Sequence, residues 1–219
     1  MIPLRASESV PKFPWFSVGA ILVFVGAEIL ARAWPGSHES FLLRQAWSPQ
    51  VPQPVRAFFT SLWFHPNLFS LVVSIVFLWA FTPRLFLRRP PWLVGALAIL
   101  GAFLTAMLYS LVFASSQAPV LLSPALVGVT LGLAMRSEIW ATVSTVVIGP
   151  GWIRLYEVPS YVLLFFWLFY LLLGNLFLPE AFASGPMLYL IPFAGFLTGF
   201  AADFFLAQFF DRRPSLPNL

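Results

Sequence analysis

The sequence predicts an all-α membrane protein, a bundle of six transmembrane helices with both termini in the cytoplasm. Of its 219 residues, 60% are hydrophobic and only 9% are charged, which is too few charges to cover a soluble domain of this size. Six apolar stretches approach the length of about 20 residues that a membrane-spanning helix needs. With the N-terminus inside, nine of the 12 Lys and Arg residues lie on the cytoplasmic side and three on the outer side, as the positive-inside rule expects.

The prediction divides the chain into one membrane domain with a tail at each end. Residues 1–13 form a polar cytoplasmic tail, residues 14–210 form the membrane domain, and residues 211–219 form a second tail. The fourth apolar stretch is shorter than the others, which suits a helix enclosed by its neighbours. The predicted helices cover residues 14–34 and about 61–82, 92–114, 121–136, 159–178 and 187–209.

Two further segments are too short or too mixed to span a membrane. Residues 35–60 combine Trp, Phe and Leu with Pro and a few charges, which favours a folded loop in the headgroup region over a plain connector. Residues 139–148, "IWATVSTVVI", are rich in β-branched side chains, but the run is ten residues long and is followed by Gly-Pro-Gly. We predict an interfacial or cytoplasmic connection there.

The composition excludes several kinds of site. The chain has no cysteine, so disulfides and thiolate metal sites are absent. Its two histidines, His38 and His65, are too few for a zinc site without carboxylate ligands. We therefore expect no metal and no cofactor. The net charge of +4 reports orientation in the lipid bilayer and does not indicate a nucleic-acid partner.

Two acidic residues fall within predicted spans. Glu28 lies four residues before Arg32, a spacing that permits an ion pair, and Asp203 lies about two turns from the cytoplasmic end of the last helix. An acid in a span is a functional hypothesis by default. Three interpretations apply to these two positions: an ion pair with a nearby arginine, a protonated and hydrogen-bonded acid, or a functional group.

Three separated stretches resemble the rhomboid intramembrane serine proteases: "TSLWFHPNLFSLVVSIVFLWAF" (60–81), "LLSPALVGVTLG" (121–132) and "IPFAGFLTGFAAD" (191–203). They are similar to that family's second helix, its short central helix with the nucleophile, and its last helix with the catalytic histidine. The resemblance implies a six-helix rhomboid-like bundle, and we expect it in the bacterial cytoplasmic (inner) membrane.

The family's catalytic residues are not preserved. The nucleophile of the family lies in a Gly-x-Ser-Gly sequence, whereas here Ser123 is followed by Pro124, which has no backbone N–H for an oxyanion. Pro192 stands at the position of the catalytic histidine, and Ser70 and Ser74 stand where the family has its oxyanion histidine and asparagine. The resemblance therefore implies vestigial positions at Ser123, Pro192, Ser70 and Ser74, and a pseudoprotease without enzymatic activity.

Ser123 has two interpretations. Ser followed by Pro is typical of a helix start, where serine caps a free N–H and proline loses nothing. The alternative is an active intramembrane serine protease with a rearranged site, in which His65 would replace the missing base. A free serine hydroxyl is a poor nucleophile without such a base, so the cap is the interpretation we adopt.

Two pairs of glycines at four-residue spacing predict close packing between the fourth and sixth helices. These are Gly128 with Gly132, and Gly195 with Gly199. Small residues at this spacing let helix backbones approach in lipid. The alternative is that glycine is simply common in membrane helices.

The function that these observations favour is non-catalytic binding of other transmembrane proteins. The protein would be an accessory or structural subunit of a membrane complex, or an adaptor that binds client helices. A transport role is less favoured because no polar helix face lines a path. The predicted partner surface joins the second and fifth helices and comprises Ser70, Ser74, Phe165, Phe166, Trp167 and Phe169.

Overall fold

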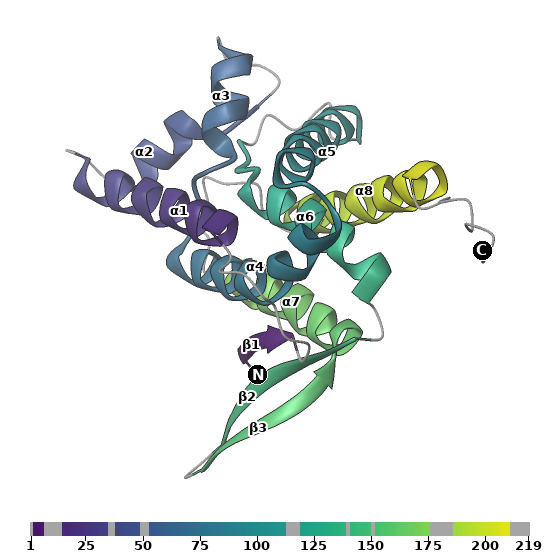
Figure 1. The fold of residues 1–219 in the computed structure, drawn as a ribbon. Coiled ribbons are helices and arrows are strands. Elements are labelled where there is room, and N and C mark those ends of the chain that lie inside the picture. Colours follow the sequence, from purple (N-terminus) through teal and green to yellow (C-terminus); the bar gives the residue numbers. More distant parts are fainter. Residues whose placement is uncertain are drawn as a thin grey trace.

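The computed structural model describes eight ranges of the chain: residues 2–6, 15–34, 38–48, 53–112, 119–138, 141–149, 152–175 and 186–210. Within these ranges the chain forms eight α-helices and one three-stranded β-sheet. The two short helices α2 and α3 lie at one end of the helical bundle, and the sheet lies at the opposite end (Figure 1). The two ends of the molecule therefore differ in structure.

Each of the six apolar stretches overlaps one of the six longer helices. Pro91 and Pro186 each begin a helix, where proline's missing N–H costs nothing. Asn67 caps another, because its Oδ1 accepts a hydrogen bond of 2.8 Å from the backbone N–H of Ser70. The six helices are α1 (Trp15–Ala33), α4 (Leu68–Arg88), α5 (Pro91–Val112), α6 (Ser123–Glu138), α7 (Ser160–Asn175) and α8 (Pro186–Phe210).

The prediction of a six-span rhomboid bundle is wrong. Among the described residues, two helices are long and apolar enough to cross a membrane, Pro91–Val112 of α5 and Leu190–Gln208 of α8. Three other apolar helices fall short, namely Leu68–Pro83, Ser123–Met135 and Ser160–Tyr170. A 16-residue helix is about 24 Å long, whereas the hydrocarbon core of a bilayer is about 30 Å thick. The fold is a mostly helical one with two candidate spans.

The prediction of an all-α protein is also wrong. Strands β1 (Ile2–Ala6), β2 (Thr142–Gly149) and β3 (Trp152–Pro159) form an antiparallel sheet in the order β1-β2-β3. β2 and β3 form a hairpin without register shifts, from Thr142 opposite Pro159 to Gly149 opposite Trp152. The β-branched run predicted as a connection is thus a strand, because such side chains fit a pleated surface. Part of the predicted N-terminal tail is its neighbour β1.

Residues 35–60, predicted as a folded interfacial loop, contain two short helices. These are α2 (His38–Gln45) and α3 (Pro54–Ser61). Trp47, which follows α2, exchanges two backbone hydrogen bonds with Val120, at 2.8 and 2.9 Å. The backbone N–H of Leu122 donates to the carbonyl of Ser61 at 2.9 Å. The segment therefore holds the beginning of α6 in place.

α6 is enclosed by the rest of the molecule. Every residue from Val127 to Met135 is buried. Its apolar side chains join a core cluster with Phe77 of α4 and Trp167 of α7, and this cluster reaches Val143 of the sheet. α6 is therefore surrounded by side chains of α4, α7 and the sheet along this stretch. The candidate site is built around α6.

Candidate functional site

The closest helix–helix contact of the candidate site joins α6 and α8. A Cβ added to Gly128 would lie 2.3 Å from the carbonyl oxygen of Pro192, and one added to Gly132 would lie 2.1 Å from that of Phe196. These distances are far below any real Cβ contact, so only glycine permits this approach. Pro192 lies within α8, is buried, and presents its backbone carbonyl to α6.

The glycines of α8 make the reciprocal contact. A Cβ on Gly195 would lie 2.5 Å from the carbonyl oxygen of Ala125, and one on Gly199 would lie 2.0 Å from that of Val129. All four glycines that the sequence indicates for helix packing thus meet at one contact. Backbones this close gain van der Waals and Cα–H···O interactions.

A fifth glycine, which the sequence analysis missed, brings α5 to the same contact. A Cβ on Gly101 would lie 2.7 Å from Cγ2 of Val129 and 3.4 Å from Cγ2 of Thr198. The sequence carries a signal for it, because Ala98, Ala102 and other small residues recur at four-residue spacing on the buried side of α5. Three helices therefore meet around Val129.

Ser123 is fully buried at the first residue of α6. Its hydroxyl donates a hydrogen bond of 2.6 Å to the backbone carbonyl of Phe64, in the connection between α3 and α4. Ser123 therefore begins α6 and also connects it, through this hydrogen bond, to the segment between α3 and α4. A hydroxyl whose proton is held by a carbonyl is not activated for nucleophilic attack.

His65 follows Phe64 in the connection between α3 and α4, and its side chain is buried. Its ring packs edge-on against Phe24 of α1, with ring centroids 4.7 Å apart and planes at 81°. In the described part of the chain neither ring nitrogen has a hydrogen-bond partner. Burial lowers the pKa of His65 to about 3, and the nearby backbone of Trp63 offsets this only in part. Such an imidazole is a poor proton acceptor at neutral pH.

The two serines of α4 lie in the interior. Ser70 and Ser74 are buried, and neither hydroxyl has a hydrogen-bond partner among the described residues. The indole N–H of Trp167 on α7 is likewise buried and without a partner there. These three residues were predicted to belong to a partner surface, but the structure encloses them.

The exposed part of the predicted partner surface is aromatic. Phe165 is 68% exposed and Phe169 is 41% exposed, both on α7. Phe166 lies partly buried between Phe165 and Tyr170, with ring centroids 6.4 and 6.1 Å away. The structure thus divides the predicted surface into an interior half and an outward-facing half on one helix.

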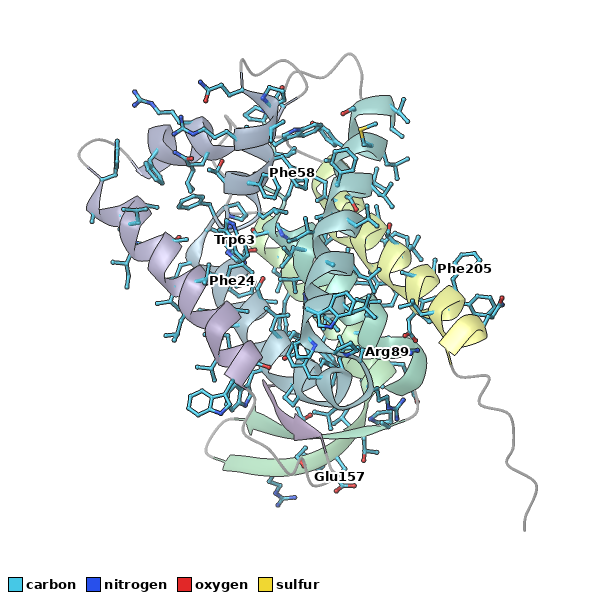
Figure 2. All side chains as sticks on the ribbon, turned by 45° about the horizontal axis from the view of Figure 1, so that its top comes forward. Phe24, Phe58, Trp63, Arg89, Glu157 and Phe205 are labelled. Atoms are coloured by element: carbon cyan, nitrogen blue, oxygen red, sulfur yellow. The ribbon has the colours of Figure 1, made fainter. Side chains whose placement is uncertain are left out.

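Both acids of the predicted spans form ion pairs. Glu28 accepts a hydrogen bond of 2.8 Å from Nε of Arg32, one turn later on α1. Asp203 of α8 contacts Nη2 of Arg89 at 3.4 Å, and both side chains are largely buried. The second pair connects α8 to the end of α4, and Figure 2 shows Arg89 directed into the bundle. The sequence named Asp203 but did not identify its partner.

Within the described ranges, no three His, Asp or Glu side chains lie close enough together to hold a metal ion. The site as described is a close contact of α5, α6 and α8. The Phe64–Ser123 hydrogen bond lies at one end of α6, and the Arg89–Asp203 ion pair connects α8 to the end of α4. Comparison of the chain with protein-family models, curated proteins and solved structures gave no match.

Proposed function

We propose that the chain is a multi-pass integral membrane protein without catalytic activity, which binds other transmembrane proteins. It would act as an accessory or structural subunit of a membrane complex, or as an adaptor that binds client helices. We propose the bacterial inner membrane as its location. We also propose that the chain is a degenerate relative of the rhomboid proteases. The support is the residue pattern at Ser123, Pro192, Ser70 and Ser74.

The observation that carries this proposal is the exposed apolar surface of the helices. A soluble protein rarely exposes an apolar patch larger than a few hundred Å², whereas here large apolar side chains point outward from several helices. Figure 2 shows one of them, Phe205, on the outer face of α8. Half or more of the side chain is exposed at Leu22, Ile29 and Leu30 of α1, Leu100, Leu111 and Val112 of α5, Phe165 of α7 and Phe205 of α8.

Three features support the absence of catalysis. The hydroxyl of Ser123 is committed to the carbonyl of Phe64, and the pKa of His65 lies far below the value that suits a general base. Pro192 cannot transfer a proton through its side chain. Catalysis by serine needs an activated hydroxyl, and these residues do not supply the activation.

The outward-facing aromatic side chains of α7 support a role in partner binding. In lipid a partner helix gains from shape and not from hydrophobicity, and rigid aromatic rings provide shape at low entropic cost. Phe165 and Phe169 are four residues apart and so lie on one face. We propose this face as the docking surface for a transmembrane partner.

Photocrosslinking in native membranes tests the docking surface. A photoreactive amino acid replaces Phe165 or Phe169, and the matched control replaces Leu104, which is 48% exposed on α5. The proposal predicts crosslinks to a membrane protein from the two α7 positions and lipid adducts alone from position 104. Lipid adducts alone at all three positions would exclude α7 as the docking surface.

The alternative function is an active serine protease with a rearranged site. A serine-reactive fluorophosphonate probe distinguishes the two. We expect no labelling that disappears in the Ser123→Ala variant. Labelling that depends on Ser123 would replace the present proposal with the enzymatic one.

A further inference from the structure

An open apolar groove lies between α3 and α5, outside the junction described above. Its volume is about 650 Å³. Every lining residue is aliphatic or aromatic, or is methionine or proline, so the groove offers little to a polar ligand. Figure 2 labels Phe58, whose ring packs edge-on against Phe103 with centroids 5.6 Å apart. The lining includes Trp47, Val55, Phe58, Ile99, Leu100 and Phe103.

We infer that this groove binds one acyl chain of an anionic phospholipid. The inference rests on the membrane embedding proposed above and adds a specific lipid site to it. The acyl chain lies against α5, and the headgroup lies beside α2 and α3. Two properties of the groove, its size and the charge around it, select this occupant.

The size of the groove favours an acyl chain over a helix. An α-helix with its side chains is 10–12 Å across, so it fills on the order of 400–600 Å³ per turn. The groove therefore encloses a volume of little more than one helical turn, so a helix would fit into it only in part. An extended hydrocarbon chain is much thinner and fits an apolar groove of this volume.

The wall formed by α3 is amphipathic. Pro54, Val55, Phe58 and Phe59 line the groove, while Thr60 turns away and hydrogen-bonds to the carbonyl of Gln45 at 3.1 Å. A short helix with one apolar face and one polar face is typical of the boundary between headgroups and acyl chains. α5, the opposite wall, is one of the two candidate spans.

Two arginines lie on the helices beside the groove. Arg56 follows Val55 on α3, and Arg44 lies in the last turn of α2; both side chains are exposed. The sequence of α3 contains no acidic residue, and that of α2 contains one, Glu39, five residues before Arg44. Nη1 of Arg56 contacts Oε1 of Gln53 at 3.4 Å, a long exposed contact that a phosphate can replace. An anionic headgroup complements these two arginines.

The test reconstitutes the full chain in vesicles of palmitoyl-oleoyl phosphatidylglycerol or of palmitoyl-oleoyl phosphatidylcholine, which differ in headgroup charge but not in acyl chains. The protein is then extracted in mild detergent, and retained lipid is counted by native mass spectrometry. Leu100→Trp fills the groove. Leu104→Trp is the matched control, since both leucines are about half exposed on α5 and Leu104 does not line the groove.

We expect one phosphatidylglycerol molecule to remain bound. Leu100→Trp should lower its retention about tenfold, the effect of displacing roughly two methylene groups, while Leu104→Trp retains it. Arg56→Gln should lower the preference for phosphatidylglycerol about fivefold and leave retention of phosphatidylcholine unchanged.

Two outcomes overturn the inference. Equal retention in both tryptophan variants shows that the lipid binds elsewhere. A dimer that Leu100→Trp abolishes shows that a second copy fills the groove. Failure of the protein to enter the vesicles is a separate result, which contradicts the proposed membrane embedding itself.

Discussion

Replacing Gly199 with alanine should destabilise the protein through the α6–α8 contact. The added Cβ would lie 2.0 Å from the carbonyl oxygen of Val129, well inside the 3.4 Å at which ordinary contact begins. The obstructing atoms are backbone, so a helix and not a side chain must move. Overpacking of this kind costs about 1–3 kcal/mol, which exceeds the 0.5–1 kcal/mol that alanine gains over glycine in a helix.

The matched control is Gly95→Ala on α5, where nothing lies within 4 Å of the added Cβ. Both variants gain the same helix propensity, so their difference isolates the overpacking cost. For a chain of this length, that cost corresponds to a difference in melting temperature of roughly 2–12 °C. Thermal unfolding in detergent, followed by tryptophan fluorescence, measures it.

We expect Gly95→Ala to melt at or above the temperature of the unaltered protein and Gly199→Ala to melt below it. Equal melting temperatures of the two variants would show that Gly199 is not enclosed by α6. The proposed junction of three helices would then be incorrect.

Three further predictions concern buried polar groups. Ser123→Ala should cost about 1–3 kcal/mol of unfolding free energy, since it leaves the buried Phe64 carbonyl without its donor; an unchanged free energy in chemical unfolding would contradict the observed bond. His65 should stay neutral in its NMR titration, because its folded pKa is about 3. In the unfolded protein His65 binds a proton below about pH 6.5, so the free energy of unfolding should fall by about 2 kcal/mol from pH 7 to pH 5. The same fall in the His65→Phe variant would show that other groups cause it. Asp203→Leu alone should destabilise the fold by about 3–5 kcal/mol, and a second change, Arg89→Leu, should recover part of that loss; additive losses in a double-mutant cycle would show that the pair is not coupled.

The positions of the six longer helices follow from the sequence because apolar composition is a local property. The number of spans does not follow in the same way. Hydropathy counts apolar residues, but the apolar part of α4 ends at Pro83, and α6 is 16 residues long. Both are shorter than the thickness of a bilayer's hydrocarbon core. This shortfall becomes visible only when the ends of the helices are known.

The sheet was missed for two different reasons. The β2–β3 hairpin had a local signal, β-branched residues followed by Gly-Pro-Gly, which the membrane context led us to interpret as a connection. β1 had no such signal, because its partner residue Val146 is far away in the sequence from Ile2. Pairing over such a distance is decided by tertiary packing and not by local propensity.

The candidate site was predictable where side-chain size decides the contact. The spacing of Gly128 and Gly132 indicates a close helix contact, since a missing side chain is visible in the sequence. The bond from Ser123 goes to a backbone carbonyl, and every residue has one, so no sequence pattern singles out Phe64. The same holds for the choice of Arg89 among several arginines as the partner of Asp203.

The most direct test of membrane embedding uses single cysteines, which the cysteine-free chain allows without further change. A nitroxide spin label is attached at Leu22, Leu104 or Phe205 in protein reconstituted in vesicles, and at Glu157 of β3 as an aqueous control. Electron paramagnetic resonance then measures collisions with oxygen and with a water-soluble nickel chelate. We predict high oxygen and low nickel accessibility at the three helix positions and the reverse at Glu157. Nickel accessibility at the helix positions equal to that at Glu157 would show that these apolar faces are not in lipid.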